Sequence, residues 1–164
     1  MSLAPLLDAP AHIQVHAFAA VLAVALGPVV IYRRRRDRIH KVVGYIWVLA
    51  MALTALSSFA ITNFGIVGPF SPVHLLAVLA LWSLVVGLRH AFARRIAAHE
   101  RVMRSLYWNG LMVASAFNFL PGRVVNRVFF NDARELGYVM IVLVLAGLAA
   151  HALRRKGSGR SITA

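Results

Sequence analysis

Four histidines recur at regular positions along this 164-residue chain. His16 and His40 are 24 residues apart, and His74 and His99 are 25 residues apart. Each histidine stands at the start of an apolar run, and a basic segment separates the two members of each pair. Imidazole nitrogens ligate metal ions and haem iron, and they exchange protons near neutral pH. These four side chains are therefore the first candidates for chemistry.

The apolar runs predict a membrane protein. Hydrophobic residues make up 60% of the chain, against about 45–50% in soluble domains, and the mean hydropathy is +0.74. Each run approaches the ~20 residues that a helix needs to cross the hydrocarbon core, and helices satisfy their own backbone polar groups there. We predict spans at about residues 15–32, 42–64, 73–88, 102–120 and 136–153.

This pattern predicts an all-α integral membrane helical bundle, with a four-helix core of two hairpins plus a fifth transmembrane helix. Residues 1–153 form a single transmembrane domain in this interpretation, and residues 154–164 form a basic, disordered tail. No Lys or Arg precedes Arg33, so the first run lacks the basic start of a signal peptide and is expected to stay in the mature protein.

The formal net charge of +13 gives the expected orientation. Fifteen of the 18 Lys and Arg residues lie in Arg33–Lys41, Arg89–Arg104 and the tail from Arg154. Cytoplasmic loops carry such an excess, so we expect a multi-pass inner-membrane protein with its N-terminus outside and its C-terminus in the cytoplasm. Topology explains the charge better than nucleic-acid binding does, and anionic lipids are expected partners at the basic side.

Several classes of protein lose support. The chain has no cysteine, which excludes disulfides, thiolate metal sites, iron–sulfur clusters and covalently attached haem. No Walker loop, His-Glu-x-x-His or Gly-x-Ser-x-Gly motif is present, so neither ATPase nor hydrolase chemistry is indicated. Whether the protein is an enzyme stays open.

Topology decides which histidines can meet. The first and third spans run in the same direction, so His16 and His74 share an outer depth, while His40 and His99 share an inner depth. Two imidazoles facing each other in a four-helix bundle suit b-type haem, which needs no cysteine. Arg123 and the inner arginines could meet its propionates. The two tiers would be roughly 30 Å apart, so one tier alone could hold a cofactor.

Small residues would admit a macrocycle between the helices; they are Ala17, Ala19, Ala20, Ala23, Gly44, Ala77 and Ala80.

Other roles for the histidines remain open. His12 and His16 are four residues apart and could form an outer site for zinc or copper with His74. A histidine at a helix end can also simply hydrogen-bond a loop carbonyl or a lipid phosphate. Glu100 and Arg104 could pair on one helix face, either at a solvated helix end or beside a quinone headgroup.

Three further features concern the helices. Gly27-Pro28 predicts a kink in the first span. Trp47, Tyr107 and Trp108 lie near inner ends of spans, where aromatic residues typically anchor a helix at the membrane interface. Residues 121–135 form an outside loop with room for a short helix.

The chain resembles a family of small bacterial predicted membrane proteins of unknown function over about residues 15–125. The residues that carry the resemblance are His16, Leu26-Gly27-Pro28, Arg38, His40, Lys41, Gly44-Tyr45, His99 and Met103-Arg104-Ser105. Lys41, Glu100 and Val102 stand where that family usually has Arg, Arg and Trp. The resemblance implies a membrane helical bundle and no particular reaction.

Taken together, the sequence predicts a membrane-embedded b-type haem protein for electron transfer, with quinol as a candidate donor. His16, His74, His40 and His99 would be its ligands. The first alternative is a non-catalytic structural or assembly subunit of a larger membrane complex. A protein partner or a homo-oligomer is a separate candidate for its partners. The second alternative is an outer-side metal-binding protein that uses His12, His16 and His74.

Overall fold

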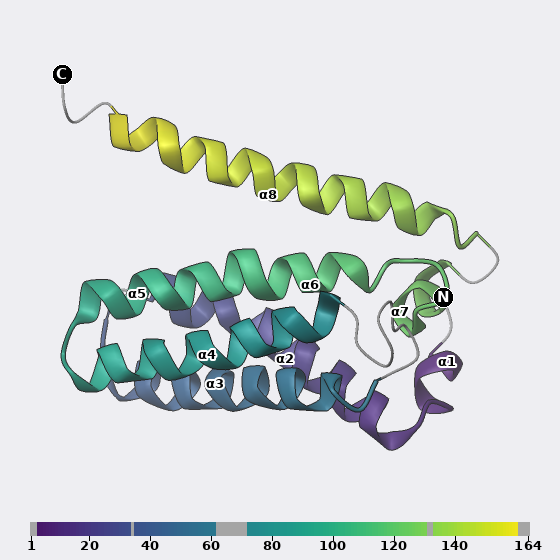
Figure 1. Cartoon of the computed structure of the whole chain (residues 1–164), viewed down its shortest axis with the longest axis horizontal. Helices are drawn as coiled ribbons and strands as arrows, with labels where there is room; N and C mark the ends of the chain where they lie inside the picture. Colours follow the sequence, from purple (N-terminus) through teal and green to yellow (C-terminus); the bar gives the residue numbers. More distant parts are fainter. Residues whose placement is uncertain (1–2, 34, 62–71, 131–132, 161–164) are drawn as a thin grey trace. The chain divides into compact units, whose positions relative to one another are not determined.

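The structure, a computed structural model, describes residues 3–33, 35–61, 72–130 and 133–160 (Figure 1). These residues form helices and short connections, with no strand among them, so the protein is an all-α membrane helical bundle. The helices are α1 (Ala4–Leu7), α2 (Ala11–Tyr32), α3 (Arg38–Ser58), α4 (Pro72–Phe92), α5 (Ile96–Ser105), the π-helix η1 (Leu106–Leu111), α6 (Met112–Phe117), α7 (Val124–Phe130) and α8 (Leu136–Arg160).

Within the described residues, four helices are long and apolar enough to cross a membrane. They are α2, α3, the part of α4 from His74 to Phe92, and the part of α8 from Leu136 to Leu153. Of residues 102–120, predicted as one span, those up to Phe117 lie in a helical run that starts earlier, at Ile96, and contains the π-helix η1. The helix α8 continues to Arg160, so part of the predicted tail is helical.

The chain divides into two compact units, which are described separately. The first unit is Leu7–Ala114. In it, α2 packs on α3, α3 on α4, and α4 on α5 and η1; α2 also contacts α5 and η1, which closes the bundle (Figure 1). The second unit contains α7, α8 and their connections, with a buried asparagine at its centre.

A proline in α2 determines how the first unit is held together. Pro28 has no backbone N–H, so the carbonyl of Val24, four residues earlier, loses its usual helical donor. The hydroxyl of Tyr107 in η1 donates to the Val24 oxygen at 3.2 Å. A hydroxyl from another helix thus replaces the hydrogen bond that the proline removes.

Glycine at position 27 allows this contact. A Cβ atom there would overlap the Tyr107 ring, because the aromatic ring packs directly on the α2 backbone. Gly27 itself is buried. The Gly27-Pro28 pair therefore both frees a carbonyl and opens the space for the side chain that satisfies it.

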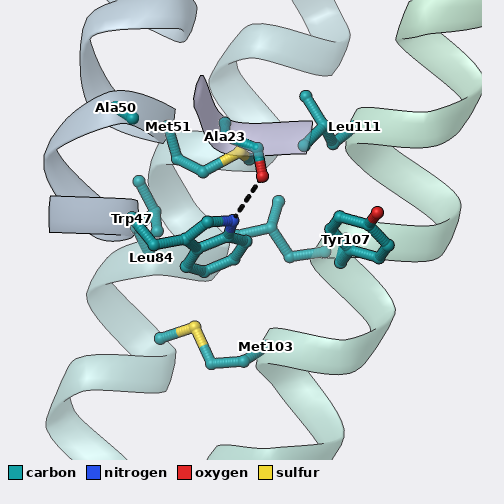
Figure 2. Packing of buried hydrophobic residues seen from close by; sticks show 9 residues of the cluster. Ala23, Trp47, Ala50, Met51, Leu84, Met103, Tyr107 and Leu111 are labelled. Atoms are coloured by element: carbon teal, nitrogen blue, oxygen red, sulfur yellow. Dashed lines mark hydrogen bonds between the residues drawn. The ribbon is translucent and has the colours of Figure 1, made fainter. Parts of the chain in front are cut away.

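A second aromatic side chain makes a similar bond one residue away. The Trp47 indole of α3 donates its Nε1–H to the carbonyl oxygen of Ala23 at 2.9 Å (Figure 2). Trp47 is 1% exposed and Tyr107 is 3% exposed. Around them pack buried apolar residues from four helical elements, which include Met51, Leu84, Met103 and Leu111.

The prediction that Trp47 and Tyr107 are interface anchors is therefore wrong. Both side chains are buried in the core of the first unit, and both donate a hydrogen bond to a carbonyl of α2. An aromatic residue with a polar tip suits a core as well as an interface when the core offers an acceptor.

The second unit is organised around Asn126 of α7. This side chain is fully buried, and its Nδ2 donates to the carbonyl oxygens of Phe119 at 2.7 Å and Arg134 at 2.9 Å. The Phe119 ring packs on the rings of Phe129 and Phe130, with centroids 6.1 and 6.3 Å apart. The amide thus links the segment before α7 to the segment after it. The helix α7 is the short helix for which the predicted outside loop, residues 121–135, had room.

Replacing Gly27 tests the close approach of Tyr107. We expect Gly27→Ala to destabilise the protein by about 1–3 kcal/mol through overpacking, less the gain of up to about 1 kcal/mol in helix propensity. Gly44→Ala is the matched control, because a Cβ at Gly44 would meet only Val30 Cγ1 at 4.0 Å. Thermal unfolding in detergent should show a lower Tm for Gly27→Ala and an unchanged or higher Tm for Gly44→Ala.

A double-mutant cycle tests whether Tyr107 replaces the hydrogen bond that Pro28 removes from the Val24 carbonyl. Tyr107→Phe should cost about 0.6 kcal/mol, and at most about 1.7, as is usual for hydrogen bonds between membrane helices. Pro28→Ala restores a backbone N–H to the Val24 carbonyl, so Tyr107→Phe should cost less in that background. Equal costs in the two backgrounds, measured by reversible unfolding in detergent, would contradict this account of the Val24 carbonyl.

Candidate histidine sites at the two ends of the bundle

The histidines predicted as a pair on the basic side lie at one end of the first unit. We call this the basic end: it comprises Arg33 and Arg35–Asp37 between α2 and α3, and the turn Ala93–Arg95 between α4 and α5. His40 is in the first turn of α3, and His99 is in the first turn of α5. Both histidines therefore lie at the basic end.

His99 is oriented by a backbone carbonyl. Its Nδ1 is 2.8 Å from the carbonyl oxygen of Gly87 in α4. A carbonyl oxygen only accepts, so the ring must donate from Nδ1. In the neutral ring the lone pair is then on Nε2, which is the state of a metal-ligating or proton-accepting imidazole.

The sequence explains why α5 comes so close to α4. Arg94 adopts the left-handed conformation with φ 56°, and the N–H of Arg95 donates to the His90 carbonyl oxygen at 2.9 Å, which ends α4 in a tight turn. A Cβ at Gly87 would overlap the Met103 side chain. The absence of a side chain at Gly87 therefore lets α5 pack closely enough for His99 to reach its carbonyl.

His40 is partly buried, and its Nδ1 atom is fully buried without a hydrogen-bond partner in the described part of the chain. Its backbone N–H donates to Asp37 Oδ1 at 3.0 Å, so Asp37 is the N-cap of α3. The cap fixes the position of the His40 backbone. A buried ring nitrogen without a partner is unusual and calls for an explanation.

Asp37 also pairs with Arg33. The Arg33 Nε donates to Asp37 Oδ1 at 3.1 Å, and a second guanidinium nitrogen contacts Oδ2. The Arg33 side-chain bond, together with the hydrogen bond from the His40 backbone, lowers the pKa of Asp37 to about 2, and the pKa of Arg33 is raised by the same partner.

Glu100 bonds across the bundle rather than along its own helix. Its Oε1 accepts a hydrogen bond from Arg36 at 2.7 Å, and this bond lowers the pKa of Glu100. The Arg104 guanidinium, the expected partner, lies instead over the Tyr32 ring, 5.9 Å from its centroid. The proposed pairing of Glu100 with Arg104 is therefore wrong, because Arg36, just before α3, binds the Glu100 carboxylate instead.

The other two predicted ligands lie at the opposite end of the first unit, beside the last residues of α3. His16 Nδ1 is 3.0 Å from the hydroxyl oxygen of Ser57. His74 is buried, 6% exposed, and its ring packs on the Phe59 ring with centroids 5.7 Å apart. The structure thus places a histidine from α2 and one from α4 against neighbouring residues of the same helix end.

The remaining candidate residues lie elsewhere. His12 is exposed in the first turn of α2. Among the described residues, no three His, Asp or Glu side chains gather closely enough to hold a metal ion. Arg123 belongs to the second unit, where burial lowers the pKa of its guanidinium.

The sequence analysis did not identify the acceptors Ser57 and Gly87. Ser57 could have been found from the register of the hairpin, since antiparallel helices joined at Arg33–Asp37 place residue 57 opposite residue 16. A backbone carbonyl such as that of Gly87 leaves no signal in side-chain chemistry.

The space inside the bundle is limited. Trp47, Tyr107 and their apolar neighbours fill the middle of the first unit (Figure 2). A shallow groove of about 340 Å³ lies between α2 and α3 and is lined almost entirely by apolar side chains, with no histidine. Chemistry that uses the histidines must therefore take place near the ends of the bundle.

Comparison with protein families assigns the chain to one of them. A family model described as "Predicted membrane protein (DUF2306)" matches residues 13–149. The chain belongs to this family. The match includes all four predicted ligands and both ends of the bundle, and it agrees with the membrane helices found in the structure. Searches of curated proteins and of solved structures give no match.

The Asp37 interactions predict a defined response to acid. Because its folded-state pKa is about 2, against an ordinary 3.8, its stabilising contribution is complete above the ordinary value and is lost as the pH falls through about 2. Asp37→Asn keeps a good helix cap but removes the charge. We expect unfolding midpoints of wild type to fall between pH 4 and pH 2 more steeply than those of Asp37→Asn; parallel curves would contradict this role.

Proposed function

We propose that this protein is a membrane-embedded b-type haem protein that transfers electrons, with His40 and His99 as one ligand pair and His16 and His74 as the other. The observation that carries the proposal is the hydrogen bond from His99 Nδ1 to the Gly87 carbonyl. It directs the lone pair of the neutral ring to Nε2, as the outer-shell partner of a ligating histidine does.

The residues at the basic end fit a haem in their chemistry. Two imidazoles come from different helices, and His40 has a buried Nδ1 atom with no partner among the described residues. Guanidinium groups at the same end, among them Arg36 and Arg104, suit carboxylate propionates. The packed centre around Trp47 confines any such group to the ends of the bundle.

Each part of the chain has a separate task in this proposal. A bound haem supplies one-electron redox chemistry. The Gly87 carbonyl holds the His99 ring in one tautomer, and Asp37 fixes the first turn of α3 that carries His40. The apolar core excludes water between the two ends. A quinol dissolved in the bilayer is our candidate electron donor.

The proposed setting is the inner membrane, with the basic end in the cytoplasm. Arg33, Arg35, Arg36 and Arg38 lie next to the start of α3, where the positive-inside rule and anionic headgroups both favour them. The N-terminus would then be outside.

An absorption spectrum tests the proposed function. Protein expressed with added haem and purified in mild detergent should show a Soret band and, after reduction with dithionite, a sharp α band. His40→Ala and His99→Ala should each remove the same spectral component, because each removes one of the two imidazoles that would hold the same haem. His90→Ala is the matched control, since His90 is in the last turn of α4 and is not a proposed ligand.

A flat spectrum from folded, haem-supplied protein would overturn the proposal. Bound zinc or copper in stoichiometric amounts would then favour the metal-binding alternative at His12, His16 and His74. Co-purification of a partner, with no effect of the histidine substitutions, would favour a structural subunit.

A further inference from the structure

We infer that Ser57 is a positioning residue for His16: its hydroxyl holds the imidazole in the tautomer that carries the proton on Nδ1 and the lone pair on Nε2. The role in presenting a ligand rests on the proposed function, whereas the tautomer itself does not. The inference goes beyond the four histidines, because Ser57 has no chemistry of its own there and acts only through His16.

The direction of the hydrogen bond follows from the other contacts of the hydroxyl. Ser57 Oγ is 2.6 Å from the carbonyl oxygen of Leu53 and 3.2 Å from that of Thr54. Carbonyl oxygens only accept, and a serine hydroxyl has a single hydrogen. That hydrogen is therefore committed to the backbone of α3.

Toward His16 the same oxygen can only accept. The distance from His16 Nδ1 to Ser57 Oγ is 3.0 Å, a normal length for an N–H donor. Nδ1 must then carry the proton. The other neutral tautomer would require the Ser57 hydroxyl to turn away from Leu53 and leave that carbonyl without its side-chain donor.

The arrangement repeats that of His99 at the other end of the first unit. There, too, a histidine donates from Nδ1 to an acceptor on the neighbouring helix, in that case the Gly87 carbonyl. The two acceptors differ in kind but impose the same tautomer. Of the two, only the serine can be removed by a side-chain substitution, so it offers the direct test.

The tautomer can be read by NMR without any cofactor. Full-length protein with ¹⁵N-labelled histidine rings, in detergent micelles well above the ordinary histidine pKa of about 6.5, gives two-bond ¹H–¹⁵N correlations that distinguish Nδ1–H from Nε2–H. The His16 signals are assigned by their loss in His16→Gln. In wild type we expect Nδ1–H, and Ser57→Ala should move the ratio toward Nε2–H by about two- to tenfold.

Two variants separate positioning from general structural effects. Ser57→Thr keeps the hydroxyl and should retain the wild-type ratio. Ser58→Ala removes a neighbouring hydroxyl that bonds the Ala55 carbonyl of its own helix at 2.7 Å, and it should not change His16. An Nε2–H majority in wild type, or the same ratio in Ser57→Ala as in wild type, would overturn the inference; the wild-type spectrum decides even if Ser57→Ala does not fold.

A redox titration of haem-loaded protein gives an independent readout. Loss of the acceptor makes the imidazole a poorer electron donor, so Ser57→Ala should raise the midpoint potential of one spectral component, and Ser58→Ala should leave it unchanged. A protein that binds no haem but shows the expected tautomers would sink the proposed function alone. A protein that binds haem but shows the other tautomer would sink the role of Ser57 alone.

Discussion

The carbonyl of Val24 is the constraint on which the rest of the first unit depends. Pro28 removes its helical donor, and inside a bilayer no water is present to replace it. Tyr107 provides the missing hydroxyl, and it can do so because Gly27 has no Cβ and because η1 carries the ring to α2. With the Trp47 bond to Ala23 one residue away, polar atoms from three helical elements meet at the Ala23 and Val24 carbonyls of α2.

The contacts of Trp47 and Tyr107 with α2 also determine which residues lie beside the histidines at the two ends of the first unit. Once α2 is fixed against α3 and η1, the antiparallel register places His16 beside Ser57 and the start of α5 beside Gly87. The same physical rule applies in the middle of the first unit and at both of its ends: a polar group away from water must find a partner on a neighbouring helix. The tautomers of His16 and His99 are consequences of that rule.

The sequence alone predicts the long apolar helices α2, α3, α4 and α8, and it predicts which two histidines lie at each end of the first unit, because hydropathy and the basic segments mark these positions directly. It fails for Trp47 and Tyr107, since a polar aromatic near the end of a span fits an interface and a core equally well. The choice depends on an acceptor carbonyl on the neighbouring helix α2. The π-turn at Leu106–Leu111 is equally hidden, because it arises from packing between helices and leaves no composition signal.

The carboxylates explain the charge distribution at the basic end. The chain has only five Asp and Glu residues, and two of them lie here, where Asp37 holds Arg33 and Glu100 holds Arg36. Arg104 rests on the Tyr32 ring instead, and its Nε is buried without a hydrogen-bond partner in the described residues. An anionic group reaching this end would therefore gain more from Arg104 than from Arg33 or Arg36, because the charges of these two already face carboxylates.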